Sequence, residues 1–89
     1  MEESENMILI ADAGSTKTEW CCAGTTVLTQ GINPFMQTEE DMVAVLSEAS
    51  AQLPVPSSIR FYGAGCPPEK SVVVKRLLSV VFPCSDIEV

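Results

Sequence analysis

The sequence has no histidine and only 5 basic residues against 12 acidic ones, which gives its 89 residues a formal net charge of −7. A surface this acidic repels the phosphates of nucleic acids and of anionic membranes, so both are poor partners. No apolar stretch is long enough to span a bilayer. The chain also starts with acidic residues, where a secretory signal has basic ones. We therefore expect a cytoplasmic protein that binds neither nucleic acid nor membrane.

The cysteines also lack the spacing that is typical of a metal site. The four cysteines (Cys21, Cys22, Cys66 and Cys84) form no Cys-x-x-Cys pair, and there is no histidine to complete a mixed site. Adjacent Cys21 and Cys22 on one strand would point to opposite faces and could not easily share a metal ion. We predict reduced thiols buried in the core, as expected in a reducing compartment.

What is present is a globular composition, with 46% hydrophobic residues. This length suffices for one small domain but not for a two-lobed enzyme with a deep cleft. No internal repeat or low-complexity segment is visible. We divide the chain into an acidic N-terminal tail, residues 1–6, and a single folded unit, residues 7–89.

Apolar runs and turn signals predict an α/β fold with the element order β-β-β-α-β-α-β. Thr38 is a good N-cap with Asp41 three positions later, and Pro67-Pro68 is a helix start signal. One helix should bury Met42, Val45, Leu46, Ala49 and Leu53, and the other Val73, Leu77 and Val80 or Val81. The strands are expected at residues 7–12, 18–23, 26–30 and 59–62 and from Asp86 onward, and the helices at 38–53 and 68–82.

These elements predict a mixed sheet. The short connections make the first three strands an antiparallel meander, with Gly24-Thr25 between the second and third, and the two helical crossovers add parallel strands. The first strand should lie in the middle, covered on both faces. Ligands bind beyond the carboxyl ends of parallel strands in such sheets. Asp12 and Gly63-Ala64-Gly65 should therefore be neighbours in space.

The stretch Asp12-Ala13-Gly14-Ser15-Thr16-Lys17 concentrates polar groups at the end of an apolar strand. It is not a Walker A loop, because Thr16 precedes Lys17 and a strand follows. Gly63-Ala64-Gly65 is not a dinucleotide fingerprint, because proline replaces the third glycine. A phosphate-gripping hairpin remains. In it, Gly14 would let the backbone approach a phosphate closely, and Ser15, Thr16 and Lys17 would donate hydrogen bonds to the phosphate oxygens. A Mg²⁺ ion between Asp12 and the phosphates would remove the repulsion between these anions. A tight hairpin with an Asx-turn at Asp12 explains the spacing equally well.

The segment Asp12–Thr18 resembles the first phosphate motif of the actin, hexokinase and Hsp70 superfamily. Within it, the chain most resembles the N-acetylglucosamine kinase-like family, which includes the ATPases that activate benzoyl-CoA reductase. Three landmarks occur in the family's order: the Asp-x-Gly-x-Thr-Lys-Thr hairpin, the Gly-x-Asn loop at 31–33, and the strand that ends in Gly63-Ala64-Gly65. The resemblance covers nearly the whole chain and implies a ribonuclease H-like (actin-like ATPase) N-terminal lobe.

The resemblance implies a role for each matching residue. Asp12 would hold Mg²⁺, and the hairpin residues Gly14, Ser15, Thr16 and Lys17 would contact the β- and γ-phosphates of ATP. Asn33 would reach the sugar, although an Asn-Pro turn former explains it equally well. Gly63, Ala64 and Gly65 would let the chain pass close to the substrate, although an ordinary strand-to-helix turn is the alternative.

The chain departs from the family in length, because family members have two lobes and are roughly three times as long. The general base, an aspartate, is expected beyond Val89, since Asp86 lies at the wrong end of its strand. We therefore interpret the chain as an N-terminal fragment of an ATP-dependent kinase that phosphorylates N-acetylglucosamine or a related sugar, inactive alone and able to form a homodimer when complete. The alternatives are an ATPase that drives a redox partner and a non-catalytic nucleotide or sugar sensor.

Overall fold

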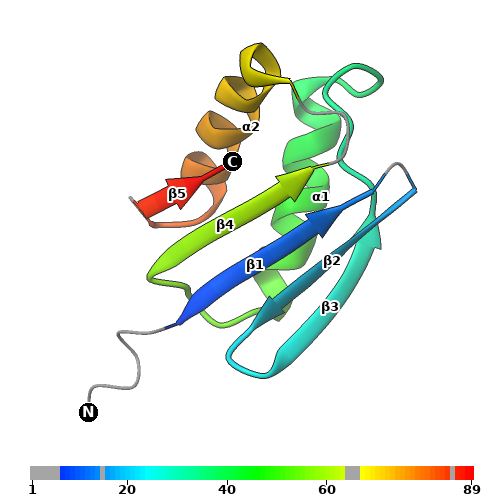
Figure 1. The fold of residues 1–89 in the computed structure, drawn as a ribbon. Helices are drawn as coiled ribbons and strands as arrows, with labels where there is room; N and C mark the ends of the chain where they lie inside the picture. Colours follow the sequence, from blue (N-terminus) through cyan, green and yellow to red (C-terminus); the bar gives the residue numbers. More distant parts are fainter. Residues whose placement is uncertain (1–6, 15, 64–66, 85) are drawn as a thin grey trace.

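The computed structural model describes residues 7–14, 16–63, 67–84 and 86–89, which form a small α/β domain with a five-stranded mixed sheet and two helices (Figure 1). The predicted element order is confirmed, and the strand order in the sheet is β3-β2-β1-β4-β5. β1 lies in the middle, antiparallel to β2 and parallel to β4. The elements are β1 (Ile8–Ala13), β2 (Lys17–Cys22), β3 (Thr25–Gln30), α1 (Glu39–Gln52), β4 (Ser58–Gly63), α2 (Pro68–Val81) and β5 (Asp86–Glu88).

A two-residue turn joins β2 to β3. Ala23 and Gly24 both have positive φ, 52° and 84°, and Thr25 already pairs with Cys22. Two consecutive residues with positive φ match the right-handed twist of a hairpin and keep the strands together. The turn therefore lies one residue earlier than predicted, and it places a residue with a Cβ in a conformation that favours glycine.

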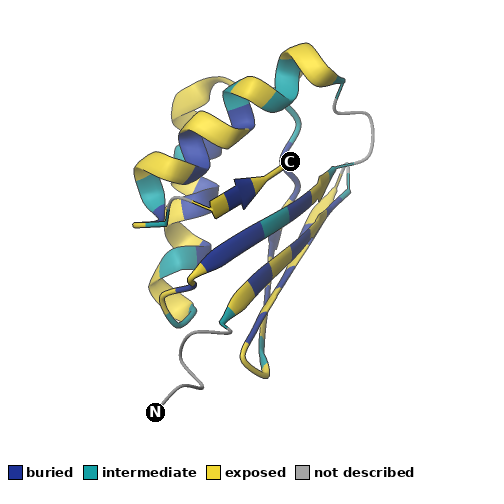
Figure 2. Cartoon of the chain, turned by 60° about the vertical axis from the view of Figure 1, so that its left-hand side comes forward, coloured by how far each residue is buried: buried dark blue, intermediate teal, exposed yellow. Residues whose placement is uncertain are grey.

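Both helices cover the same face of the sheet (Figure 2). Along β1 and β2, exposed and buried residues alternate strictly, as period-2 geometry requires when one face is covered. The prediction that β1 is covered on both faces is wrong for this chain: Ile8 and Ile10 are 43% and 48% exposed. A continuous apolar run does not reveal on its own how many faces are buried.

The helix α1 begins as predicted. Thr38 Oγ1 accepts a hydrogen bond from the Asp41 backbone N–H at 3.1 Å, and the Asp41 carboxylate accepts from the Thr38 N–H at 3.4 Å. This reciprocal capping box satisfies two N–H groups that would otherwise lack partners. Four of the five predicted apolar positions are buried, whereas Leu53 is the half-buried C-cap.

The buried stripe of α2 differs in part from the prediction. Leu77 is buried as expected, and Val74 and Leu78 are the other buried positions, whereas the predicted Val73 and Val81 are half-buried and pack against the core. Val80 is 69% exposed. Because Val72-Val73-Val74 offers an apolar residue at every position, the sequence does not specify which of the three faces the core.

Trp20 is the centre of the core. It is fully buried, and its indole N–H donates to Thr29 Oγ1 at 2.9 Å across the β2–β3 ladder. Its ring lies 6.3 Å from that of Phe61 on β4 and 6.1 Å from that of Phe82 at the end of α2, measured between centroids. These contacts join the antiparallel and parallel halves of the sheet to α2. Of the helices described, neither α1 nor α2 has the length and apolar character needed to cross a membrane.

The cysteines divide between core and surface. Cys22 is buried, Cys84 is half-buried and Cys21 is exposed, so the prediction of core thiols is wrong for Cys21. Cys21 and Cys22 do lie on opposite faces, as strand geometry predicts. Burial raises the pKa of the Cys22 thiol, and the adjacent Cys21 raises that pKa further. Cys66 lies outside the described residues.

Candidate functional site

The predicted landmarks meet at one end of the sheet, where the carboxyl ends of the parallel strands β1 and β4 lie. Because β1 and β4 are parallel and Ala13 pairs with Gly63, the carboxyl ends of both strands lie side by side there (Figure 1). The loop after β3 reaches the same end, because the Gly31 N–H donates to the Thr16 carbonyl at 3.1 Å. The structure thus brings the β1–β2 hairpin, the Asn33 loop and Gly63 together, whereas Ser15, Ala64 and Gly65 lie outside the described residues.

A hollow of about 300 Å³ lies on the open face of the sheet at this hairpin, and it has a polar lining. Asp12, the Lys17 side chain and Thr16 are all exposed. Within the described part of the chain, these three side chains make no hydrogen bond or ion pair and are available to a ligand. The lining residues are Asp12, Gly14, Thr16, Lys17 and Glu19.

Gly14 closes the turn of this hairpin. Its N–H donates to the Lys17 carbonyl at 2.8 Å, and a Cβ built at Gly14 would lie 3.3 Å from the same oxygen. Any residue other than glycine would therefore crowd this oxygen, and the turn would have to shift by a few tenths of an ångström to admit it. Because this N–H is already used inside the turn, the side-chain donors that the described part of this hairpin offers to a phosphate are the hydroxyl of Thr16 and the ammonium of Lys17.

Glu19 is a site residue that the sequence analysis did not identify. In the hairpin, Ala13 pairs with Thr18 and Asp12 with Glu19, so both carboxylates project from the open face. Like charges directly opposite each other across strands are destabilising unless a cation lies between or beside them. The sequence contained this information, because residues equally far from a hairpin turn are paired across the two strands.

The carboxylate pair suits Mg²⁺ better than a metal ion that takes all of its ligands from the protein. Among the described residues, no group of three or more His, Cys, Asp or Glu side chains is placed to hold a metal ion. Mg²⁺ is commonly held by one or two carboxylates together with waters and substrate phosphates. Asp12 and Glu19 beside the donors of Thr16 and Lys17 fit that pattern.

Asn33 makes the turn that was one of its two predicted roles. Its Oδ1 accepts from the Phe35 N–H at 3.0 Å, and its own N–H donates to Gln37 Oε1 at 2.7 Å. Gln37 in turn donates from Nε2 to the Gly31 carbonyl at 2.9 Å. The side-chain oxygen is therefore used within the loop, and the Asn33 amide nitrogen is the group left to donate to a ligand.

Asp86 lies at the opposite end of the strands, at the start of β5. It pairs with Ser58 at the start of β4, and its carboxylate is 3.5 Å from Arg60 Nη2. Glu88 also approaches this guanidinium, at 3.5 Å from Nε. This position, far along the strand from Gly63, gives Asp86 a structural ion pair and keeps it away from the phosphate hairpin.

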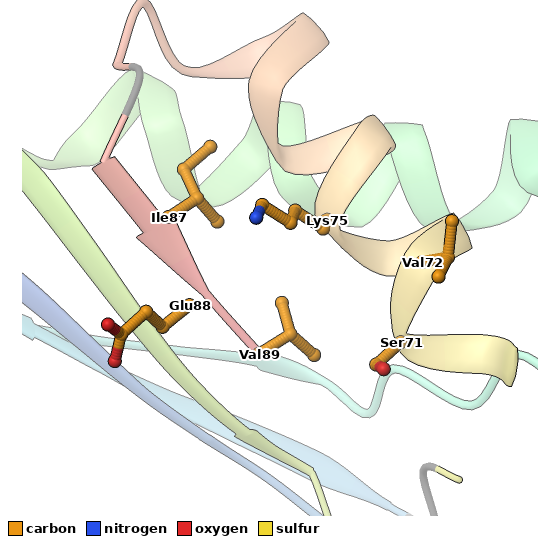
Figure 3. Close-up of a pocket in the computed structure, with 6 residues that line it drawn as sticks. All are labelled: Ser71, Val72, Lys75, Ile87, Glu88 and Val89. Carbon is orange, nitrogen blue, oxygen red and sulfur yellow. The ribbon is translucent and has the colours of Figure 1, made fainter. Parts of the chain in front are cut away.

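A second hollow, of about 390 Å³, lies between α2 and β5 (Figure 3). Figure 3 shows the Lys75 side chain extending from α2 toward the strand, with Ile87 and Val89 on the strand side. Polar and aliphatic groups share this lining about equally, and none of the residues predicted for phosphate, metal or sugar binding takes part in it. The residues that line it are Ser71, Val72, Lys75, Ile87, Glu88 and Val89.

Comparison with known proteins gives no family for the chain. No family model matches the sequence, and no curated protein matches it either. The functional interpretation therefore depends on the residues of the hairpin and on the end of the sheet where they lie.

Proposed function

We propose that residues 7–89 form the phosphate-binding N-terminal part of a cytoplasmic, ATP-dependent sugar kinase that acts on N-acetylglucosamine or a related amino sugar. The observation that carries this proposal is the hairpin hollow, in which two carboxylates lie beside a hydroxyl and an ammonium. Mg-ATP needs this mixture, because its metal requires oxygen ligands and its phosphates require donors.

The fold supports a ribonuclease H-like lobe. An antiparallel three-stranded meander continues into parallel β4 and β5, with β1 central, and both crossover helices pack on one face. In this arrangement the β1–β2 hairpin, rather than a loop before a helix, would contact the phosphates. It thereby separates the proposal from the Walker A and dinucleotide-binding classes, which use helix N-termini.

In the proposed mechanism, the chain's own groups bind and orient the phosphates. Thr16 donates from its hydroxyl and Lys17 from its ammonium to the oxygens of the terminal phosphates, and Gly14 permits the close approach. Asp12 and Glu19 would hold Mg²⁺, which when bound neutralises charge on the β- and γ-phosphates. The aspartate that takes the proton from the sugar hydroxyl is expected beyond Val89.

The test uses the protein encoded by the complete open reading frame. A coupled assay with ATP, Mg²⁺ and a panel of sugars should show phosphoryl transfer to an N-acetylated amino sugar. An ATPase that drives a redox partner would instead hydrolyse ATP without a sugar and carry iron, which its colour reveals. A sensor would bind nucleotide or sugar with no turnover. Either of these two results would overturn the proposal.

A further inference from the structure

The two outer strands of the sheet differ in how they are protected against pairing with another strand. β5, at one edge, contains only three residues, and two of them, Asp86 and Glu88, are acidic. β3, at the other edge (Figure 1), contains six residues and has neither a charged side chain nor a proline. Proteins block exposed edges with short strands, charges or prolines, because an open edge is a template for another strand. β3 uses none of these devices, and its threonines and valine favour extended structure.

The register of the β2–β3 ladder shows which backbone groups of β3 face the open edge. Thr25 pairs with Cys22 across the two-residue turn, and the Gly31 N–H donates to the Thr16 carbonyl. Residues of this parity therefore turn their backbone groups toward β2, and the residues between them turn their N–H and C=O groups outward. No described strand pairs with these outward groups. They belong to Thr26, Leu28 and Gln30.

A hollow of about 350 Å³ lies beside this edge, between the end of β3 and α1. The buried Val45 contributes to its lining, and the two charged lining residues, Asp41 and Glu48, are both acidic and exposed. Neither makes an ion pair with a described residue. They are two helical turns apart on α1, which is about 10 Å. The residues that line the hollow are Gln30, Gln37, Asp41, Ala44, Val45 and Glu48.

We propose that the open edge of β3 and this hollow bind an extended, basic segment of a partner protein by β-strand addition. The segment adds a strand to the sheet, and its main chain forms hydrogen bonds with the outward backbone groups of β3. Its alternate side chains enter the hollow, where an apolar one contacts Val45 and basic ones on either side face Asp41 and Glu48. Three alternate residues of a strand span about 13 Å, which flexible lysine or arginine side chains can match to the acidic pair.

Charge favours a basic partner over a second copy of this chain. α1 carries four acidic residues and no basic one, so two copies paired through β3 would bring like charges together. The net charge of −7 attracts a basic segment to the same surface. This partner site goes beyond the proposed kinase function and does not depend on it.

The test uses the complete protein, labelled with ¹⁵N, and a capped seven-residue peptide with lysine at positions 2 and 6, valine at position 4 and threonine elsewhere. In hydrogen-exchange NMR, the outward amides of Thr26 and Leu28 should become protected at least about tenfold when the peptide is added. The amide of Val27, which faces β2, should not change. This pattern reports backbone pairing at the edge rather than contact in general.

Two peptide variants separate backbone pairing from charge. A peptide with glutamate in place of both lysines should bind at least about tenfold more weakly. N-methylation at positions 3 and 5 should have a different effect from N-methylation at positions 4 and 6, because only one of these alternate sets turns its N–H groups toward β3. One methylated peptide should lose the protection and the other should keep it.

A pair of protein variants tests the acidic side of the hollow. Glu48→Lys should raise the Kd of the lysine peptide about tenfold. Glu40→Lys, on the same helix but outside the lining of the hollow, makes the same change of charge and should alter the Kd by less than about twofold.

The inference is wrong if the lysine peptide gives no protection at the β3 edge, if the glutamate peptide binds equally well, or if the two methylated peptides behave alike. Equal effects of the two glutamate substitutions would also overturn it. Protection of the Thr26 and Leu28 amides that rises with protein concentration, without peptide, would show that a second copy occupies the edge instead. None of these measurements uses turnover, so the test stands whether or not the protein phosphorylates sugars.

Discussion

Asp12 on β1 and Glu19 on β2 are direct cross-strand partners, and both carboxylates project from the open face of the sheet beside Lys17. A pair of opposed carboxylates lowers the stability of an isolated hairpin. The same pair becomes favourable when a divalent cation is bound. The hairpin therefore has the electrostatics of a site that is completed by its ligand.

The Asp12→Asn variant of the complete protein should fold normally and lose phosphoryl transfer. Removing a carboxylate that holds the metal should cost several kcal/mol of transition-state stabilisation, which is about a thousandfold in rate. Glu19→Gln should have a smaller effect in the same direction and raise the Mg²⁺ concentration needed for half-maximal rate. Near-normal turnover of Asp12→Asn at saturating Mg²⁺ would contradict the assignment.

Asn33→Ala should raise the KM for the sugar more than the KM for ATP. The substitution removes an amide donor, typically worth about 1–3 kcal/mol when its partner is left unsatisfied. It also removes the oxygen that accepts from Phe35, so the loop loosens. Asn33→Asp keeps that oxygen and deletes the donor, which makes it the matched control for loop geometry. Equal effects of Asn33→Ala on both substrates would limit Asn33 to the turn.

The 89-residue chain on its own should have no kinase activity and should self-associate. The proposed mechanism takes its base aspartate from outside these residues, and the open sheet face exposes Ile10, Leu28 and Tyr62 at 48%, 61% and 60%. Leu28→Lys should reduce the association measured by light scattering, and Val80→Lys, on the surface of α2, is the comparison. Robust sugar phosphorylation by a monomer of this chain would contradict the placement of the base beyond Val89.

Ala23→Asn should stabilise the fold. Ala23 has a φ of 52°, where an L-residue with a Cβ is strained and asparagine is better tolerated. We expect the free energy of unfolding to rise by about 0.5–1 kcal/mol, measured by urea denaturation. Gly24→Ala, next in the same turn, should lower it by a similar amount. An unchanged or lower midpoint for Ala23→Asn would mean that the turn differs from the one described.

Alkylation should distinguish the two adjacent cysteines. Cys21 is exposed, whereas Cys22 is buried and burial raises the pKa of its thiol. A raised pKa leaves a smaller thiolate fraction at any pH below it, so the reaction of Cys22 should lag and should accelerate only as the pH rises. Peptide mapping after iodoacetamide treatment at about pH 8 should find Cys21 modified first. Equal rates in the folded protein would show that the register of β2 is wrong.

Local signals were enough to predict most of the fold. The order of elements, the Thr38 capping box and the central position of β1 follow from periodicity, caps and short connections. Which face of each element is covered could not be predicted, because that depends on neighbours distant in sequence. Ile8 and Ile10 show this for β1, and the Val72–Val74 run shows it for α2.

The site could be predicted only where its residues are contiguous. Asp12, Gly14, Thr16 and Lys17 belong to one short segment, so their proximity was visible in the sequence. Glu19 enters the site through its pairing with Asp12 across the β1–β2 hairpin, a relationship that can be read from the sequence only once the position of the turn is known. The role of Asn33 divides between the turn that the structure describes and the sugar contact that stays a prediction.

The two ends of the strands in this sheet differ in function under the proposal. The turn at Ala23–Gly24, the start of β4 at Ser58 and the start of β5 at Asp86 all lie at the end away from the phosphate hairpin. Spectroscopic labels, affinity tags and inserted sequences placed at that end would report on the domain without touching the proposed chemistry. The turn at Ala23–Gly24 is therefore the natural attachment point for a probe of nucleotide binding.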